Sequence, residues 1–211
     1  MFNENTIKFL VDLKANNDRE WFEANRKIYE QDVRDAAKLF SQRVSELLEV
    51  ATGNPHQGKI FRIHRDVRFS KDKTPYNSHI RMSYWHSGRP AVWMIGIEPG
   101  KLTFGAGVMG FAPEQMQNWR KFVDDGESAA LEKALKPLLT SGCRLPDPEL
   151  KRVPAPYPQD HPTGELLRRK SFTIWRDAKE LRQCLGEAGP ATCVEALKPF
   201  GPIVGWLNEN I

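Results

Sequence analysis

The sequence lacks the features that mark several classes of protein. It has only three cysteines, Cys143, Cys184 and Cys193, and no CxxC pair. Such an odd set argues against a disulfide framework or a zinc site, and it favours a reducing, cytoplasmic setting. No apolar run approaches the ~20 residues that a membrane helix needs, and no basic stretch followed by an apolar one opens the chain. We therefore expect neither a membrane span nor a signal peptide.

Excess charge is also scarce outside one segment. The formal net charge is +4, yet the segment from Lys59 to Arg81 alone holds seven Lys or Arg against two Asp. The other 188 residues therefore carry a net charge of −1. Non-specific nucleic-acid binding usually needs a broader basic face, so we interpret the basic segment as a local site.

The pattern of apolar residues indicates an α+β fold in a single domain, residues 1–211. We expect helices over residues 1–53, a sheet over residues 59–108, and helices with a proline-rich loop over residues 113–211. The predicted sheet is antiparallel, has about four to five strands, and packs against a long N-terminal helix and C-terminal helices. Its short connections, such as HSGRP and EPGK, are typical of a meander.

The N-terminal part has the period of amphipathic helices. Asn3 or Asn5 is the expected cap of a first helix. A second helix is predicted to run without a break from about Asp18 to Val50. It would begin at a capping box formed by Asn17 and Glu20 and end near Gly53.

The middle of the chain has the period of strands. The predicted strands are Phe61–Phe69, Ile80–Tyr84, Ala91–Ile97 and Lys101–Val108. After them, Pro113 is the expected start of a helix, and another helix is predicted over Leu131–Leu139. The segment Cys143–Pro162 has six prolines and should be extended, with helical segments resuming over Thr163–Lys170 and Asp177–Leu185.

Three short motifs resemble known sites but do not fit them. Gly105–Gly110 matches GxGxxG, but Pro113 sets the following helix too late for a dinucleotide site, so close packing explains these glycines better. The triplet His64–Asp66 imitates a kinase loop, but Lys71 stands where that loop needs Asn. The segment PDPELK holds its acids on one proline-broken stretch, whereas a nuclease needs them on separate elements.

The charged segment is the strongest candidate for a site. In an extended strand, alternate side chains share a face, so one face would present Arg62, His64, Asp66 and Arg68. Phe61, Ile63, Val67 and Phe69 would point the other way, into the core. The joining loop would add Lys71, Asp72, Lys73 and Tyr76, stiffened by Pro75.

Converging cations on a rigid turn suit a carboxylate or phosphate ligand, because arginine binds such groups with two hydrogen bonds. Two other interpretations stay open. In one, the segment is a solvent-exposed face on which arginines and aspartates form ion pairs. In the other, His64, Asp66 and His79 bind a metal. The excess of cations favours anion binding, and we assign no metal.

Three stretches give the chain a family resemblance: NNDREWF, RDVRFSKDKTPYNSHI and KRVPAPYPQDHPTGELLRRKSF. They resemble a widespread bacterial family of conserved hypothetical proteins, the domain-of-unknown-function family 2461. The resemblance covers nearly the whole chain and implies a single-domain soluble protein, with no catalytic role to transfer. VPAPYP lacks a glycine expected from the family, and GAGVMG is a looser glycine run than usual.

Together, the charge pattern and the resemblance select candidate residues. The predicted ligand contacts are Arg65, Arg68, Lys71, Lys73, Arg81, Lys151, Arg152 and Lys170. The candidate acid–base residues are His64, Asp66, Asp72 and Tyr76. The functional classes left open are an enzyme for an anionic substrate, a non-catalytic binder of an anion or, less favoured, of a nucleic acid, and a structural or partner-binding protein whose charged signature is an ion-pair network. The sequence names no cofactor and no oligomeric state.

Overall fold

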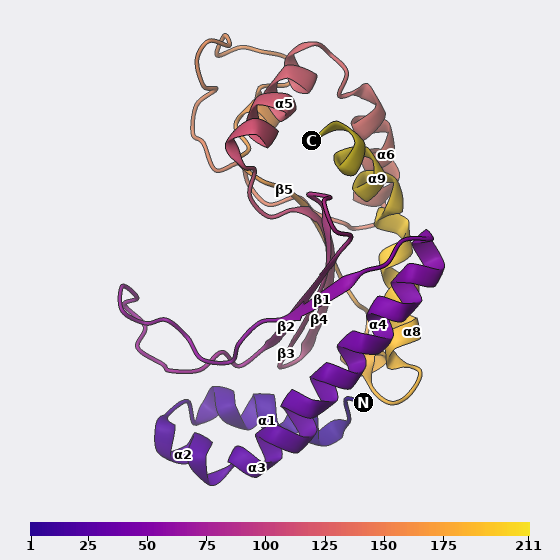
Figure 1. Cartoon of the computed structure of the whole chain (residues 1–211). Coiled ribbons are helices and arrows are strands. Elements are labelled where there is room, and N and C mark those ends of the chain that lie inside the picture. The colour runs from indigo at the N-terminus through magenta and orange to yellow at the C-terminus, as the bar shows by residue number, and fades with distance from the viewer. The chain divides into compact units, whose positions relative to one another are not determined.

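The chain folds into a five-stranded antiparallel sheet with helices, which confirms the predicted α+β class (Figure 1). The computed structural model describes residues 1–211. They form two compact units: unit 1 is 1–87, 94–104 and 177–196, and unit 2 is 88–93, 105–176 and 197–211. Each unit is described separately below. That residues 1–211 form one domain stays a prediction.

The strands follow one another in the sheet in the order of the chain. They are β1 (Gln57–Ile60), β2 (Ile80–Trp85), β3 (Val92–Glu98), β4 (Lys101–Val108) and β5 (Phe172–Asp177). β1 and β2 pair antiparallel, with Gln57 opposite Trp85 and Ile60 opposite Met82. Three of these strands lie where the sequence predicts strands. β5 does not, because it lies in the part for which only helices and a loop were expected.

Unit 1 begins with a capped helix, α1 (Glu4–Ala15). The side chain of Asn3 accepts a hydrogen bond from the backbone N–H of Thr6, which confirms Asn3 as one of the two expected caps. Phe9, Leu10 and Leu13 are buried on one face of this helix. The first helix, which the spacing of apolar residues predicted, is therefore confirmed.

The long helix expected from Asp18 to Val50 is helical but not continuous. It consists of α2 (Arg19–Ala24), α3 (Arg26–Ile28), a π-helical segment (Tyr29–Asp35) and α4 (Ala36–Thr52), with a break at Asn25. Asp18, not Asn17, caps its start, through a bond from the N–H of Trp21. In the π-helical segment the carbonyl of Asp32 accepts a bond of 2.6 Å from the Thr6 hydroxyl, so a tertiary contact satisfies this backbone group.

α4 packs on β1 and β2 and closes the core of unit 1. Its buried side chains include Phe40, Val44 and Leu48. The helix ends at Gly53, which has φ +73°, the left-handed conformation that a helix stop of this kind requires. The predicted stop is confirmed.

Unit 2 contains four α-helices. Its helices are α5 (Pro113–Asp124), α6 (Ala129–Thr140), α7 (Gly164–Leu167) and α9 (Gly201–Asn210). Pro113 opens α5 as predicted, and α6 covers the segment expected around residues 131–139. Trp119 of α5 is fully buried and lies against Phe111, Phe172 and Trp206. This aromatic cluster forms the centre of the unit 2 core.

The glycines of the GxGxxG stretch make room for β5. A Cβ on Gly107 would lie 2.0 Å from the carbonyl oxygen of Phe172, and a Cβ on Gly105 would lie 2.5 Å from Cε3 of Trp175. Gly107 also has φ +133°, which other residues rarely adopt. Close strand packing therefore explains Gly105 and Gly107.

Two segments predicted to be helical near the C-terminus are wrong in part. Asp177 ends β5 instead of capping a helix, and only Leu181–Cys184 forms a 3₁₀ turn before α8 (Gly189–Leu197). Of Thr163–Lys170, only α7 is helical. The proline-rich segment has no helix and no strand beyond an isolated bridge at Arg144, as expected.

None of the helices is both long and apolar enough to cross a bilayer. The three cysteines are free and buried. Burial raises the pKa of the Cys184 thiol to about 12.

Candidate functional site

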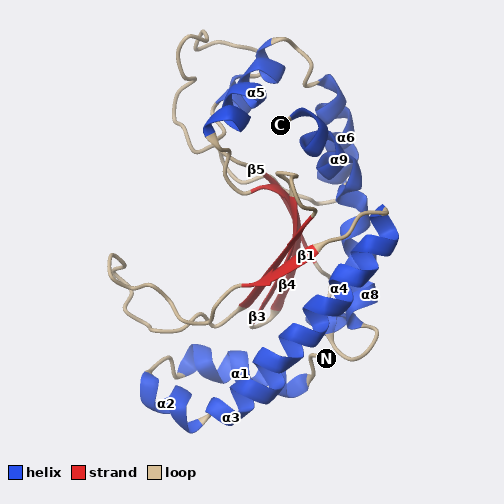
Figure 2. Cartoon of the chain, in the orientation of Figure 1, coloured by secondary structure: helices blue, strands red, loops and turns tan.

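Residues 61–79, named here the basic loop, join β1 to β2 (Figure 2). The prediction of a strand over Phe61–Phe69 is wrong. Three backbone bonds tie the two arms of the loop: Phe61 N to Arg81 O (2.9 Å), Asn77 N to Ile63 O (2.7 Å) and Arg65 N to Pro75 O (2.9 Å). Beyond an isolated bridge between His64 and Tyr76, the segment forms no ladder.

A change of register explains why the strand stops. Ile60 lies opposite Met82, but His64 lies opposite Tyr76, so the return arm has two more residues than the outgoing arm. Extra residues on one arm break the ladder and leave backbone groups without strand partners. The predicted alternation of faces therefore fails. Ile63 is buried, but Phe69 is 96% exposed and Phe61 is 40% exposed.

The base of the basic loop is anchored on the helices of unit 1. The buried ring of Tyr76 stacks on Phe22 of α2, with ring centroids 4.1 Å apart and planes at 14°. The side chain of Asn17 holds the Tyr76 backbone from both sides: its oxygen accepts from the N–H at 3.0 Å, and its amide donates to the carbonyl at 2.9 Å. His64 packs edge-on against Tyr76. Tyr76 is therefore an anchor of the loop.

The side chain of Arg65 connects the two arms of the loop. Its guanidinium donates to Asp72 Oδ2 at 2.6 Å and to the carbonyl and hydroxyl of Thr74. Asp72 in turn accepts from the N–H and the hydroxyl of Thr74. These Thr74 bonds and the Arg65 guanidinium lower the pKa of Asp72 to about 2. Asp72 therefore stays ionised at neutral pH.

Arg68 uses the other carboxylate of the loop. Its Nε and Nη2 donate to the two oxygens of Asp66 at 2.9 and 2.6 Å, and this pairing lowers the pKa of Asp66. The Arg68 side chain is nevertheless 77% exposed. Lys73 donates to the carbonyl of Val67 at 2.9 Å, so it bridges the loop without a carboxylate.

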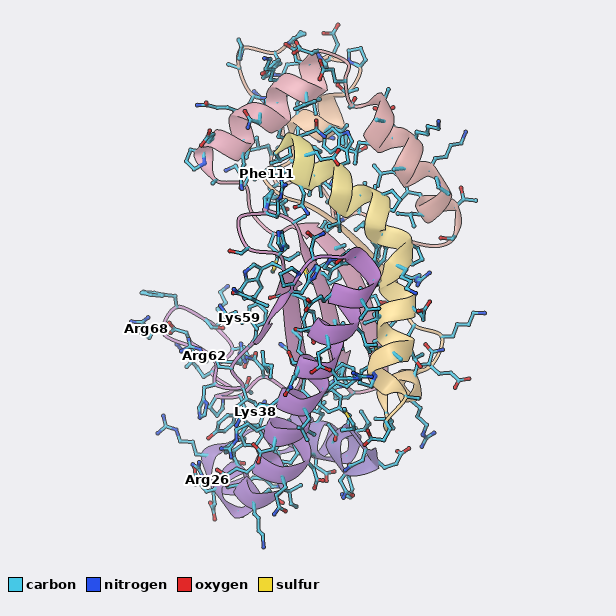
Figure 3. All side chains as sticks on the ribbon, turned by 45° about the vertical axis from the view of Figure 1, so that its right-hand side comes forward. Arg26, Lys38, Lys59, Arg62, Arg68 and Phe111 are labelled. Atoms are coloured by element: carbon cyan, nitrogen blue, oxygen red, sulfur yellow. The ribbon has the colours of Figure 1, made fainter.

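Four further cations of the segment from Lys59 to Arg81 have no carboxylate partner. They are exposed and form no ion pair: Lys59, Arg62, Lys71 and Arg81. Figure 3 shows Arg68 at the far end of the loop, with Arg62 and Lys59 nearer to β1. The loop therefore presents cationic groups both at its tip and at its base.

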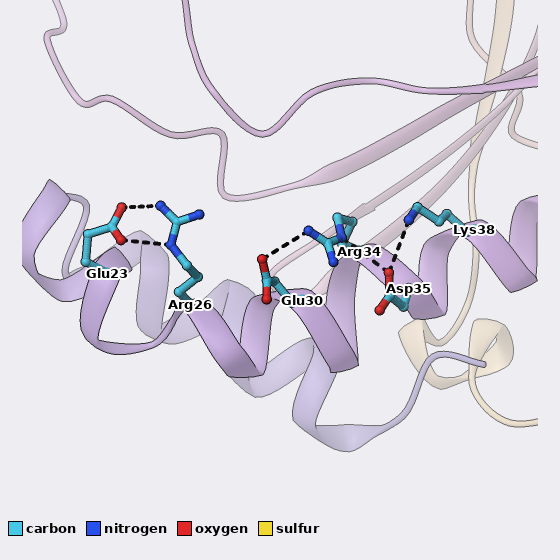
Figure 4. A network of polar contacts seen from close by, with 6 residues as sticks. All are labelled: Glu23, Arg26, Glu30, Arg34, Asp35 and Lys38. Carbon is cyan, nitrogen blue, oxygen red and sulfur yellow. Dashed lines mark hydrogen bonds and ion pairs between the residues drawn. The ribbon is translucent and has the colours of Figure 1, made fainter.

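Several charged side chains on the N-terminal helices of unit 1 are paired. Arg26 pairs with Glu23, Arg34 with Glu30 and Asp35, and Lys38 with Asp35, in the helical segments from α2 to α4 (Figure 4). Apart from the adjacent Arg34 and Asp35, these partners are three or four residues apart, the spacings that bring side chains together on a helix. Residues 4–52 hold eight Lys or Arg against ten Asp or Glu, so the excess of positive charge lies on the basic loop and not on these helices.

The candidate acid–base residues differ in what surrounds them. Asp66 and Asp72 each hold an arginine and have a lowered pKa, which makes them poor proton donors and weak bases at neutral pH. His79 is half-buried, and burial together with Arg81 lowers its pKa. No group of three or more His, Cys, Asp or Glu side chains is arranged to hold a metal ion, and this includes His64, Asp66 and His79.

The remaining predicted ligand contacts belong to unit 2. Lys151 and Arg152 are exposed on the proline-rich segment. The backbone N–H of Lys170 donates to Glu149 at 2.8 Å, and its carbonyl accepts from the N–H of Phe111. The structure therefore divides the predicted contacts between the two units.

The sequence assigned other roles, or none, to three residues that shape the loop. Asn17 was expected in a helix cap and Phe69 in the core, and Phe22 was not singled out. Asn17 and Phe22 lie in NNDREWF, one of the stretches that carry the family resemblance. No local signal distinguishes Phe69 from a buried strand residue.

The model of a family described as conserved hypothetical protein (DUF2461) matches residues 5–206. A search of curated proteins finds no match. Because the family model spans nearly the whole chain, this protein belongs to the DUF2461 family of conserved hypothetical proteins.

Proposed function

We propose that the basic loop binds an anionic ligand that carries carboxylate or phosphate groups. The observation that supports this proposal is that both carboxylates of the loop are already paired with arginines. Asp66 pairs with Arg68 and Asp72 pairs with Arg65, so no carboxylate is left for the other cations. An exposed group of unneutralised cations attracts anions and raises their local concentration.

The cations have different roles in this proposal. Arg65 shapes the loop, since its donors are used within it. Lys71 and Lys73 approach the ligand from the tip, and Arg62 and Arg81 from the base. Arg68 contributes its exposed side, because a guanidinium has five donors and the pair with Asp66 uses only some of them.

Catalysis at the same site is a further proposal. Of the four candidate acid–base residues, His64 is the best suited to proton transfer, because Asp66 and Asp72 are tied to arginines and the ring of Tyr76 is buried. Lys151, Arg152 and Lys170 stay proposed contacts for an anion in unit 2. We also propose a bacterial cytoplasmic protein, since buried free thiols suit a reducing compartment.

A second candidate function is structural. The contacts of Arg65 with Asp72 and Thr74 and the clamp of Asn17 on Tyr76 order a long connection that has no regular structure. These contacts support the view that part of the charged signature stabilises the fold. Arg65 and Asp72 would then be fold residues, whereas Arg62, Lys71 and Arg81 would not.

The experiment compares single variants in a thermal-shift titration with tripolyphosphate and citrate at low salt. Arg62→Ala and Lys71→Ala should weaken ligand-induced stabilisation by about tenfold in apparent affinity, because a bond to a charged group contributes about 1.5–3 kcal/mol. Their melting temperatures without ligand should stay near that of the wild type, since exposed charges contribute only about 0–1 kcal/mol.

Lys38→Ala is the matched control, because Lys38 is an exposed cation on α4 with a carboxylate partner. The proposal is wrong if the wild type gains no stability from either anion, or if Lys38→Ala weakens binding as much as Lys71→Ala does. Arg65→Ala separates the structural role: it should lower the melting temperature even without ligand.

A further inference from the structure

Two exposed phenylalanines accompany the cations of the basic loop. Phe69, near the tip, is 96% exposed, and Phe61, at the end of β1, is 40% exposed. A single exposed apolar side chain is ordinary on a protein surface. Here, however, both rings lie on one arm of the basic loop, among its cations, and a ligand would explain both features.

Each ring is accompanied by cations in the same way. Lys59 Nζ lies 5.2 Å from the ring centroid of Phe61, and Arg68 Cζ lies 5.9 Å from that of Phe69. In the sequence, Lys59 and Arg62 flank Phe61, and Arg68 and Lys71 flank Phe69. The loop therefore repeats one combination: an exposed ring with a cation before and after it.

We propose that the basic loop binds single-stranded nucleic acid, with Phe61 and Phe69 as stacking platforms for bases and Lys59, Arg62, Arg68 and Lys71 as contacts for phosphates. This inference rests on the proposed function and names the ligand class. Single strands expose base faces, and aromatic side chains within a positively charged surface bind them with little sequence preference. In a duplex the bases are already stacked on one another, so a phenylalanine ring cannot stack on a base face.

The arrangement fits a nucleic acid better than a lipid surface. A membrane-inserting loop gathers its apolar residues at one apex, but Phe61 and Phe69 lie eight residues apart on the arm. Bases and phosphates alternate along a strand, as rings and cations do here.

The test is fluorescence anisotropy with a short fluorescein-labelled oligothymidylate and its RNA counterpart. Phe69→Ala should weaken binding about tenfold, since stacking of one base on an aromatic side chain is worth about 1–3 kcal/mol. Arg62→Ala should weaken it as well and should make the dependence of log affinity on log salt shallower by about 0.7, the value expected for one phosphate contact on a single strand.

Leu39→Ala and Lys38→Ala are the matched controls, because both residues are exposed on α4, away from the loop in sequence. Neither should change oligonucleotide binding. The inference is overturned if the wild type does not bind the oligonucleotide at low salt. It is also overturned if Phe61→Ala and Phe69→Ala bind as the wild type does.

Separate outcomes identify which proposal fails. If the cation variants weaken both tripolyphosphate and oligonucleotide binding while the phenylalanine variants weaken neither, the anion site stands and stacking is excluded. Phe69→Trp distinguishes the nucleic acid from a membrane. Its additional fluorescence should be quenched by the oligonucleotide, whereas a blue shift with phosphatidylserine vesicles and no response to the oligonucleotide would assign the loop to a lipid surface.

Discussion

The basic loop of unit 1 and the proline-rich segment of unit 2, residues 143–162, are both long connections without helices, yet they are ordered by different means. The proline-rich segment restricts its own backbone, because each proline fixes φ. It also buries Val153, whose carbonyl accepts a bond of 2.7 Å from Gln159. Arg169, only 2% exposed, donates to the carbonyl of Pro146 at 2.7 Å.

The basic loop has one proline and is anchored only at its base, by Tyr76, Asn17 and Arg65. Its tip, around Phe69, has few contacts besides the Arg68–Asp66 pair and the bonds of Lys73. Exposed segments with few buried contacts lie at the low end of local stability. A long connection whose tip makes few contacts suits ligand binding, whereas one with contacts along its whole length suits a structural role.

The largest effect is expected at Phe22, on which the ring of Tyr76 stacks. Phe22→Ala should destabilise the protein by about 3–5 kcal/mol, because it empties a buried site that Phe9, Tyr29 and Tyr76 all contact. Denaturant unfolding measures this loss. Leu39→Ala, at an exposed site, should change stability by less than about 0.5 kcal/mol. A loss below about 1 kcal/mol for Phe22→Ala would show that the loop is not anchored there.

A smaller effect is expected in the proline-rich segment. Arg169→Met removes the bond to Pro146 and the pair with Glu165 but keeps the apolar stem. It should cost about 1–3 kcal/mol, the value for a charged hydrogen bond with its acceptor left unpaired. Hydrogen exchange should quicken around Pro146–Leu150 but not in the basic loop. Equal changes in both segments would mean that they do not differ in how they are held.

The smallest effect concerns acid titration of the basic loop. The folded pKa of Asp72 is about 2, below the unfolded value of 3.8, so the Asp72 contacts stabilise the fold above the unfolded pKa. This stabilisation is lost as pH falls through about 2. The amide resonance of Thr74 should therefore titrate near that pH. In Arg65→Ala the midpoint should move upward, and an unchanged midpoint would show that Arg65 does not hold the carboxylate.

The parts of the fold that local sequence predicted are those whose cause is local. Asn3 caps α1, Pro113 opens α5, and the alternation of Lys101–Val108 gives β4, because each depends on a few neighbouring residues. β5 was missed, since its pairing depends on the close approach that Gly105 and Gly107 permit.

For the site, the sequence by itself determined which residues carry charge, that the cations outnumber the carboxylates, and that they gather in one short segment. Only the tertiary structure decided which cations are used within the loop. It also decided that the side chain of Phe69 is exposed to solvent and that the side chain of Tyr76 is buried. The physical reason is the pairing register: two extra residues on the return arm end the ladder after β1, so contacts with Asn17 and Phe22, and not strand alternation, set the direction of each side chain.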